Sequence, residues 1–167
     1  MEITIGKKLV FSTDLPGTET ETRETQIQSA SGGEEKISLQ DLPLLLYVED
    51  NDISQRIVER FLQGICKLAF AKTGQEALEL VQRMVSTNKA LYKGFLMNIH
   101  LGGMNGVQVT KELRKLPQYA AIPIIAVTAF AMRGDKENFI EAGYTDYISK
   151  PFSRDELVSL IKKYLRT

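Results

Sequence analysis

The feature that most constrains the fold of this chain is an alternation of short apolar runs with longer segments of helical periodicity, from Leu42 onward. The first run, LLLYV at 44–48, is typical of a strand covered on both faces of a parallel sheet. Parallel strands need crossover connections, and right-handed crossovers place helices on both faces. The pattern therefore predicts an α/β fold, a doubly wound sandwich with a central five-stranded parallel sheet. Strands are expected at 44–48, 67–71, 95–98, 123–127 and 147–149.

The helices between these strands carry their own start signals. Thr73 with Glu76, and Ser153 with Glu156, are spaced as capping boxes, in which each side chain accepts a hydrogen bond from the other residue's backbone N–H. Further helices are expected at about 107–116 and 135–142. The first helix is expected to turn one apolar stripe toward the sheet. That stripe consists of Ile53, Ile57, Val58, Phe61 and Leu62.

Composition divides the chain into three parts. Residues 16–41 are rich in Thr, Glu, Ser and Gly and poor in residues that form a core, which predicts a flexible linker. Residues 1–15 contain one strand-like run that is too short to fold alone. Residues 42–167 are the predicted globular domain.

Charge and cysteine content exclude several functional classes. Lys and Arg total 21, as do Asp and Glu, so the chain lacks the basic footprint of a nucleic-acid or acidic-membrane binder. The single cysteine, Cys66, fits a reducing compartment and excludes an internal disulfide. No apolar run approaches the roughly 20 residues of a membrane span. We expect a cytoplasmic protein that binds neither nucleic acid nor membranes.

Polar residues end four of the predicted strands. Glu49 and Asp50 follow the first, Asn98 ends the third, Thr128 the fourth and Lys150 the fifth. Because the carboxyl ends of parallel strands share one edge of the sheet, these residues should form one pocket. Paired carboxylates suit Mg²⁺, and a lysine ammonium and a threonine hydroxyl both bind phosphoryl oxygens. The first loop lacks the glycines of a nucleotide site, so a phosphoryl group is the expected ligand.

Four segments, in this order, resemble the motifs of the response-regulator receiver domain. They are LLLYVEDND (44–52), FLMNIHLGGMNG (95–106), PIIAVTA (123–129) and YISKPF (147–152). The resemblance covers about residues 42–166 and implies the family's flavodoxin-like topology. It also implies a function in two-component phosphorelay signalling, as a module that is not itself an enzyme.

The resemblance implies a magnesium site beside a phosphoacceptor position. Glu49 and Asp50 match the family's acidic metal-binding pair, and the backbone carbonyl of His100 matches a third metal contact. Asn98 falls where the family has the phosphoacceptor aspartate, and it could still ligate Mg²⁺ through its amide oxygen. The side chain of His100 has a plainer interpretation, as an exposed loop residue.

The same resemblance assigns a switch. Thr128 matches the switch hydroxyl, Lys150 the lysine that pairs with the phosphoryl group, and Tyr147 the aromatic side chain that changes rotamer with Thr128. The bond from Lys150 to Pro151 matches a cis peptide in the family. Tyr147 could equally be an edge-packing residue.

Asn98 alters the predicted chemistry. An amide carries no negative charge and is a poor nucleophile, so the chain as written is predicted not to form an acyl phosphate. Glu49, Asp50 and Lys150 together carry a charge of −1, where a pocket with an additional aspartate would carry −2. A natural substitution and a deliberate Asp→Asn change both fit, because the other pocket residues are retained. Whether the pocket is active-like or inactive stays open.

Partners and alternatives follow from the resemblance. A histidine kinase or a histidine phosphotransfer domain is the expected partner, with a homodimer through the fourth helix, fifth strand and fifth helix as a further expectation. EITIGKKLVFSTDLP (2–16) is similar to the last strand of a histidine-kinase ATP-binding domain, which suggests a piece of a hybrid kinase; a plain N-terminal extension is the alternative. The competing functions are a degenerate receiver that acts as a scaffold and a Mg²⁺-dependent phosphohydrolase. The phosphohydrolase needs an acid two residues after its nucleophile, where His100 stands.

Overall fold

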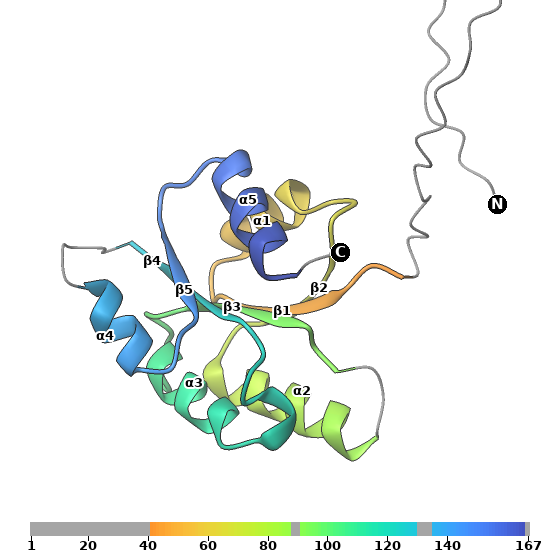
Figure 1. The fold of residues 1–167 in the computed structure, drawn as a ribbon, viewed down its shortest axis with the longest axis vertical. Coiled ribbons are helices and arrows are strands. Elements are labelled where there is room, and N and C mark those ends of the chain that lie inside the picture. The colour runs from red at the N-terminus through yellow and green to blue at the C-terminus, as the bar shows by residue number, and fades with distance from the viewer. Residues whose placement is uncertain (1–40, 88–90, 130–134, 166–167) are drawn as a thin grey trace, which may run out of the picture. The chain divides into compact units, whose positions relative to one another are not determined.

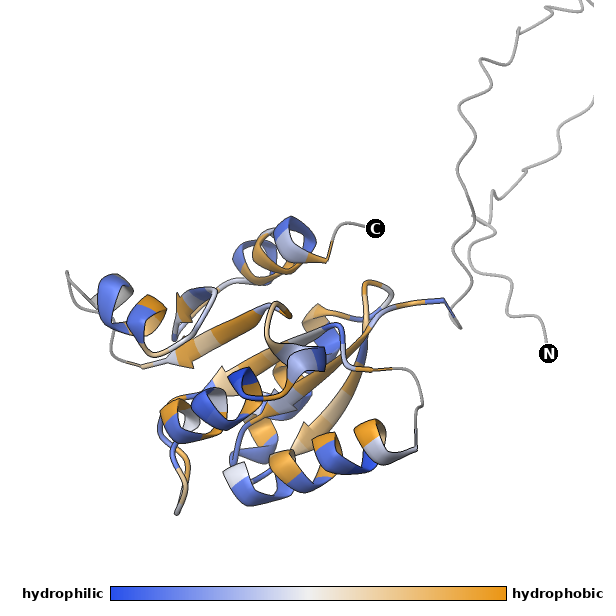
Figure 2. Cartoon of the chain, turned by 60° about the horizontal axis from the view of Figure 1, so that its bottom comes forward, coloured by the Kyte–Doolittle hydropathy of each residue, from blue (hydrophilic) through white to orange (hydrophobic). Residues whose placement is uncertain are grey.

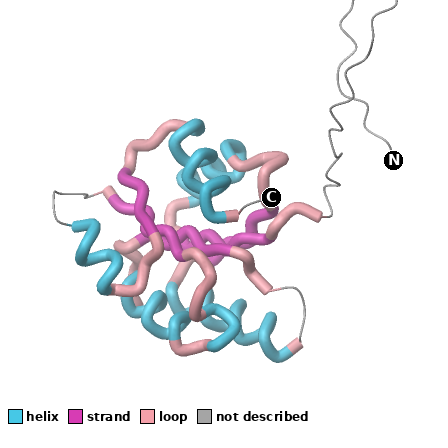
Figure 3. The backbone as a smooth tube through the Cα atoms, viewed as in Figure 1, coloured by secondary structure: helices cyan, strands magenta, loops and turns pink. Residues whose placement is uncertain are grey.

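The computed structural model describes residues 41–87, 91–129 and 135–165. Its centre is a five-stranded sheet in the order β2-β1-β3-β4-β5, and every pair of neighbouring strands is parallel. Figure 3 shows the strands as a middle layer between helices. Each strand begins and ends within one residue of its predicted position. The strands are β1 Leu44–Val48, β2 Lys67–Ala71, β3 Gly94–Asn98, β4 Ile124–Thr128 and β5 Asp146–Ser149.

Helices cover both faces of this sheet. α1 and α5 lie on one face, while α2 and α3 lie on the other, with α4 beside β5 (Figure 1). This arrangement confirms the doubly wound fold. The helices are α1 Asp52–Phe61, α2 Gly74–Ser86, α3 Gly106–Arg114, α4 Asp135–Glu141 and α5 Arg154–Tyr164, with a 3₁₀ turn at Pro117–Tyr119.

Strand β1 supplies side chains to two core layers. Leu46 and Val48 pack in the layer under α2 and α3, and Leu45 and Tyr47 pack in the layer under α1 and α5. Figure 2 shows the strands largely in the hydrophobic colour and the helices in both colours. Fully burying one such apolar side chain stabilises the fold by about 1.5–3 kcal/mol. The two layers therefore hold the carboxyl edge of the sheet in place from both sides.

The predicted apolar stripe of α1 is wrong at two positions. Ile53 is 70% exposed and Ile57 is 45% exposed, whereas Val58 and Leu62 are buried. The helix is rotated so that Gln55 faces the sheet, where its side-chain amide donates a hydrogen bond to the backbone oxygen of Glu49 at 2.6 Å. That bond joins the start of α1 to the end of β1. In this orientation Ile53 and Ile57 are exposed to solvent.

One of the two predicted capping boxes is complete. Ser153 and Glu156 form the reciprocal pair at the start of α5. At α2 the hydroxyl of Thr73 accepts the N–H of Glu76, but the Glu76 carboxylate accepts the N–H of Lys72 at 2.7 Å. The second bond therefore lies one residue earlier than a capping box requires.

Two further expectations concern regions before the domain. The strand-like run in 1–15 and the linker, apart from Asp41, lie outside the described residues. Among the helices that the structure does describe, none is both long and apolar enough to cross a membrane.

Candidate functional site

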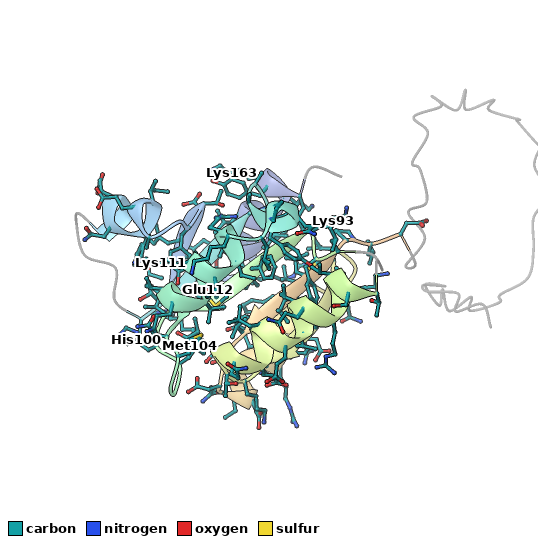
Figure 4. The ribbon with its side chains drawn as sticks, turned by 90° about the horizontal axis from the view of Figure 1, so that it is seen from below. Lys93, His100, Met104, Lys111, Glu112 and Lys163 are labelled. Atoms are coloured by element: carbon teal, nitrogen blue, oxygen red, sulfur yellow. The ribbon has the colours of Figure 1, made fainter. Side chains whose placement is uncertain are left out.

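Four strand ends meet at the carboxyl edge of the sheet. Glu49 follows β1, β3 ends at Asn98, β4 ends at Thr128, and Lys150 follows β5. These four strands are consecutive neighbours in the sheet, so their ends lie side by side. Figure 4 labels His100 in the loop that follows β3, away from Lys93, which precedes this strand. The sheet topology thus places these four residues at one edge of the sheet.

Glu49 is the centre of this cluster. Its side chain is 2% exposed. Its Oε2 atom accepts the Tyr47 hydroxyl at 2.8 Å and the Lys150 ammonium at 2.5 Å. Its Oε1 atom accepts the Asn98 side-chain amide at 3.2 Å and the Asn51 backbone N–H at 3.4 Å. Both carboxylate oxygens are therefore occupied by protein donors.

Asn98 uses both ends of its amide group. Its Nδ2 atom donates to Glu49, and its Oδ1 atom accepts the backbone N–H of His100 at 3.2 Å. The side chain is buried at 8% exposure, while the side chain of His100 is exposed. An aspartate at 98 would have no N–H to offer, because an ionised carboxylate only accepts hydrogen bonds. The bond to Glu49 thus depends on the amide.

Lys150 is positioned by the sheet. Its backbone N–H donates to the carbonyl oxygen of Thr128 at 2.6 Å, which ties the end of β5 to the end of β4. The peptide bond to Pro151 is cis, as the resemblance implied. The side chain is 26% exposed, and its stem helps to line a hollow of about 210 Å³ beside α1. Lys150 therefore reaches Glu49 from a fixed backbone position.

Tyr47 is a pocket residue that the sequence reasoning missed. It lies two residues before Glu49 on the same strand, so both side chains point to the same face. Burial, together with the nearby Glu49 carboxylate, raises the pKa of the Tyr47 hydroxyl, which keeps it protonated as a donor. A tyrosine two positions before an acid, in an otherwise apolar strand, was the signal in the sequence.

Two predicted site residues are more exposed than Glu49. Asp50 is exposed, whereas the adjacent Glu49 is buried. Tyr147 is half-buried, and its ring packs against Phe139 of α4 with ring centroids 5.5 Å apart. Thr128 is buried at the end of β4. The side chains of Asn98, Lys150 and Tyr47 all donate hydrogen bonds to the Glu49 carboxylate.

The oxygen donors at this edge match magnesium in type. They are the carboxylates of Glu49 and Asp50, the amide oxygen of Asn98 and the backbone carbonyl of His100, which are hard ligands of the kind that Mg²⁺ prefers. Within the described ranges, no group of three or more His, Cys, Asp and Glu side chains is placed to hold a metal ion. The donor atoms are thus of the type that Mg²⁺ prefers. The set contains only two carboxylates, because residue 98 is an amide.

Comparison with known proteins gives consistent matches across this domain. A family model, the response regulator receiver domain, matches residues 45–162. Hybrid signal transduction histidine kinase I of Dictyostelium discoideum is 37% identical over 139 residues, which span 80% of this chain and 8% of that protein. The polar-differentiation response regulator DivK of Brucella ovis is 34% identical over 122 residues, which span 72% of this chain and 94% of that protein.

A solved structure shows the same fold. The receiver domain of the sensor histidine kinase PA1611 from Pseudomonas aeruginosa superimposes with a TM-score of 0.65 at 32% identity, covering 75% of this chain and 98% of that one. That domain has a magnesium ion coordinated in its active-site cleft.

Proposed function

The chain belongs to the response-regulator receiver family of two-component signalling, and we propose that it is a receiver module that cannot be phosphorylated as written. The observation that carries the proposal is the amide of Asn98, which ends β3 and donates to Glu49 Oε1 at 3.2 Å. We assign this residue to the phosphoacceptor position. A phosphoacceptor needs a free carboxylate oxygen to attack phosphorus. Asn98 supplies a neutral amide whose oxygen accepts the N–H of His100 instead.

The other residues of the pocket keep the chemistry of a phosphoryl site. Lys150 offers an ammonium group and Thr128 a hydroxyl group, both of which pair with phosphoryl oxygens. Glu49, Asp50, the Asn98 amide oxygen and the His100 carbonyl would hold Mg²⁺. A bound magnesium ion supplies positive charge that stabilises the phosphoryl oxygens.

Signalling would proceed through a shift between two conformations. We assign Thr128 and Tyr147 to that switch, because Thr128 ends β4 and Tyr147 lies on the neighbouring strand β5, two residues before Ser149, which pairs with Thr128. The ring of Tyr147 packs on Phe139, so a change of its rotamer would be transmitted to α4. A receiver of this kind changes its output by shifting a population rather than by turnover.

The expected partners are a histidine kinase or a histidine phosphotransfer domain. A homodimer through α4, β5 and α5 is the second expected assembly. Similarity to a hybrid histidine kinase supports an origin as one receiver segment of such a protein. In that case residues 1–15 would belong to the preceding kinase domain, and 16–41 would be the linker to the receiver at 42–167.

A phosphorylation-independent scaffold is the second candidate. The observation that favours it is the full set of protein donors around Glu49, which satisfies the buried carboxylate without a ligand. A scaffold and an unphosphorylatable receiver differ in whether the Asn98→Asp variant accepts a phosphoryl group and changes its affinity for a partner.

The experiment is phosphorylation of the Asn98→Asp variant by acetyl phosphate in the presence of Mg²⁺, followed on a phosphate-affinity gel. Asn105→Asp is the matched control, because Asn105 is the N-cap of α3 and aspartate is an equally good N-cap. We expect phosphoryl uptake by Asn98→Asp only. Equal uptake by the unmodified chain would refute the proposal, and no uptake by Asn98→Asp would favour the scaffold.

A further inference from the structure

We propose that Lys150 is the resident counterion of Glu49 in this chain, so that the buried pocket is electrically complete without a divalent ion. The inference deepens the proposed function and rests on it, because it takes Glu49 and Lys150 to be the pocket residues of a receiver. It concerns the metal requirement of this particular sequence, which has an amide at position 98.

The first step is the burial of the Glu49 carboxylate. A buried ionised carboxylate is strongly disfavoured unless it is paired with a cation and hydrogen-bonded at both oxygens. At 2% exposure, Glu49 has the ammonium of Lys150 and the hydroxyl of Tyr47 on Oε2, and two N–H donors on Oε1. These donors meet both requirements from within the chain.

The second step is the charge of the buried part. Glu49 contributes −1 and Lys150 contributes +1, so the two sum to zero. Asp50 is exposed, and water therefore stabilises its charge. A divalent ion that bound Oε2 would compete with the ammonium group already there, and it would gain only one buried carboxylate as a charged ligand.

The third step is the difference that Asn98 makes. A carboxylate at position 98 would stand against Glu49 Oε1, where the amide nitrogen now lies at 3.2 Å. Two carboxylates this close repel each other, and a cation between them relieves that repulsion. An aspartate at 98 would thus create a need for further positive charge, and the amide removes that need.

The fourth step is the fixed position of the lysine. Its backbone is tied to Thr128, and its stem lines the hollow that Tyr47 and Val58 also line. A long side chain held in this way loses less conformational entropy on pairing than one that reaches in from a loose loop. The ion pair is therefore a built-in part of the fold.

The test compares magnesium binding by the full unmodified chain and by Asn98→Asp, using isothermal titration calorimetry. Urea unfolding in MgCl₂ and in NaCl of equal ionic strength gives a second readout. We expect the dissociation constant for Mg²⁺ to be at least about tenfold higher for the unmodified chain, because one anion is missing from the pocket. Its unfolding midpoint should be the same in the two salts, whereas that of Asn98→Asp should rise in MgCl₂.

Lys150→Met tests the counterion directly, with Lys115→Met as the matched control. Lys115 pairs with Glu112 on the surface, where both side chains are largely solvated. Lys150→Met should lower the unfolding midpoint in NaCl and recover part of that loss in MgCl₂. Lys115→Met should do neither. Should Lys150→Met fail to fold, Lys150→Arg, which keeps the charge, should fold and remain insensitive to Mg²⁺.

Two results would overturn the inference. One is a magnesium affinity of the unmodified chain equal to that of Asn98→Asp, and the other is a Lys150→Met midpoint equal to that of Lys115→Met in both salts. Failure of the proposed function would be seen elsewhere, as an Asn98→Asp variant that binds Mg²⁺ but takes up no phosphoryl group.

Discussion

The hydroxyl of Tyr47 offers a sharp test of how the buried Glu49 is held. Tyr47→Phe removes one donor, at 2.8 Å from Glu49 Oε2, and leaves the aromatic ring in place. The ring keeps its contact with Phe70, whose centroid lies 6.4 Å away. The substitution therefore isolates a single hydrogen bond to a buried charge.

The expected loss in the free energy of unfolding is large for a substitution that removes one oxygen atom. A hydrogen bond to a charged group contributes about 1.5–3 kcal/mol net. Tyr47 is fully buried and Glu49 nearly so, so water does not replace the lost donor. We expect the free energy of unfolding to fall by about 2 kcal/mol. Urea unfolding followed by far-ultraviolet circular dichroism at neutral pH measures this difference.

Tyr144→Phe is the matched control for this measurement. The Tyr144 hydroxyl is also buried, but its neighbouring polar group is the neutral hydroxyl of Thr110 and not a charged side chain. Removing it should lower the free energy of unfolding by less than about 1 kcal/mol, because no buried charge loses a donor. Equal effects of the two substitutions would show that the Tyr47 hydroxyl does not support the Glu49 carboxylate.

Four further substitutions probe the rest of the fold by urea unfolding. Arg114→Met should cost about 3 kcal/mol, because the guanidinium makes five hydrogen bonds that join the ends of α3 and α4 to the start of β4; a loss below about 1 kcal/mol would contradict this. Ile57→Gln should lower the free energy of unfolding by less than about 0.5 kcal/mol, because Ile57 is 45% exposed. Leu62→Ala should lower it by about 2–5 kcal/mol, because Leu62 is buried. The reverse order would contradict the observed rotation of α1. Burial raises the pKa of the Cys66 thiol from 9.0 to about 11, so the unfolded state loses this proton first as pH rises. Stability should therefore fall by up to about 1.4 kcal/mol per pH unit between pH 9.0 and about 11, and Cys66→Ala should flatten that decline. An unchanged slope would contradict this expectation.

The strands were predictable from sequence because each is a compact run that the core must bury on both sides. The rotation of α1 about its axis was not predictable from sequence. Its apolar residues allow two orientations of the helix, each of which would bury a different pair of them. One orientation would bury Ile53 and Ile57, and the other buries Val58 and Leu62, as observed. The observed rotation brings the side chain of Gln55 to the backbone oxygen of Glu49, a tertiary contact that the helical periodicity does not show.

The candidate site was predictable as a set of positions but not as a set of contacts. The topology alone brings Glu49, Asn98 and Lys150 to one edge of the sheet. The sequence does not show that Glu49 is buried while Asp50 is exposed, since the two are adjacent and chemically alike. Nor does it show that Tyr47 reaches Glu49, because that bond depends on how the side chain packs.

Mapping phosphoryl groups to individual residues tests the role of Asn98 most directly. Borohydride reduces an aspartyl phosphate to homoserine, which mass spectrometry of proteolytic peptides locates. After treatment with acetyl phosphate and Mg²⁺, we predict homoserine at position 98 in the Asn98→Asp variant and at no position in the unmodified chain. Homoserine at another aspartate such as Asp50, or hydroxynorvaline from a reduced glutamyl phosphate at Glu49, as the main product in the variant would contradict the assignment of position 98 as the phosphoacceptor site.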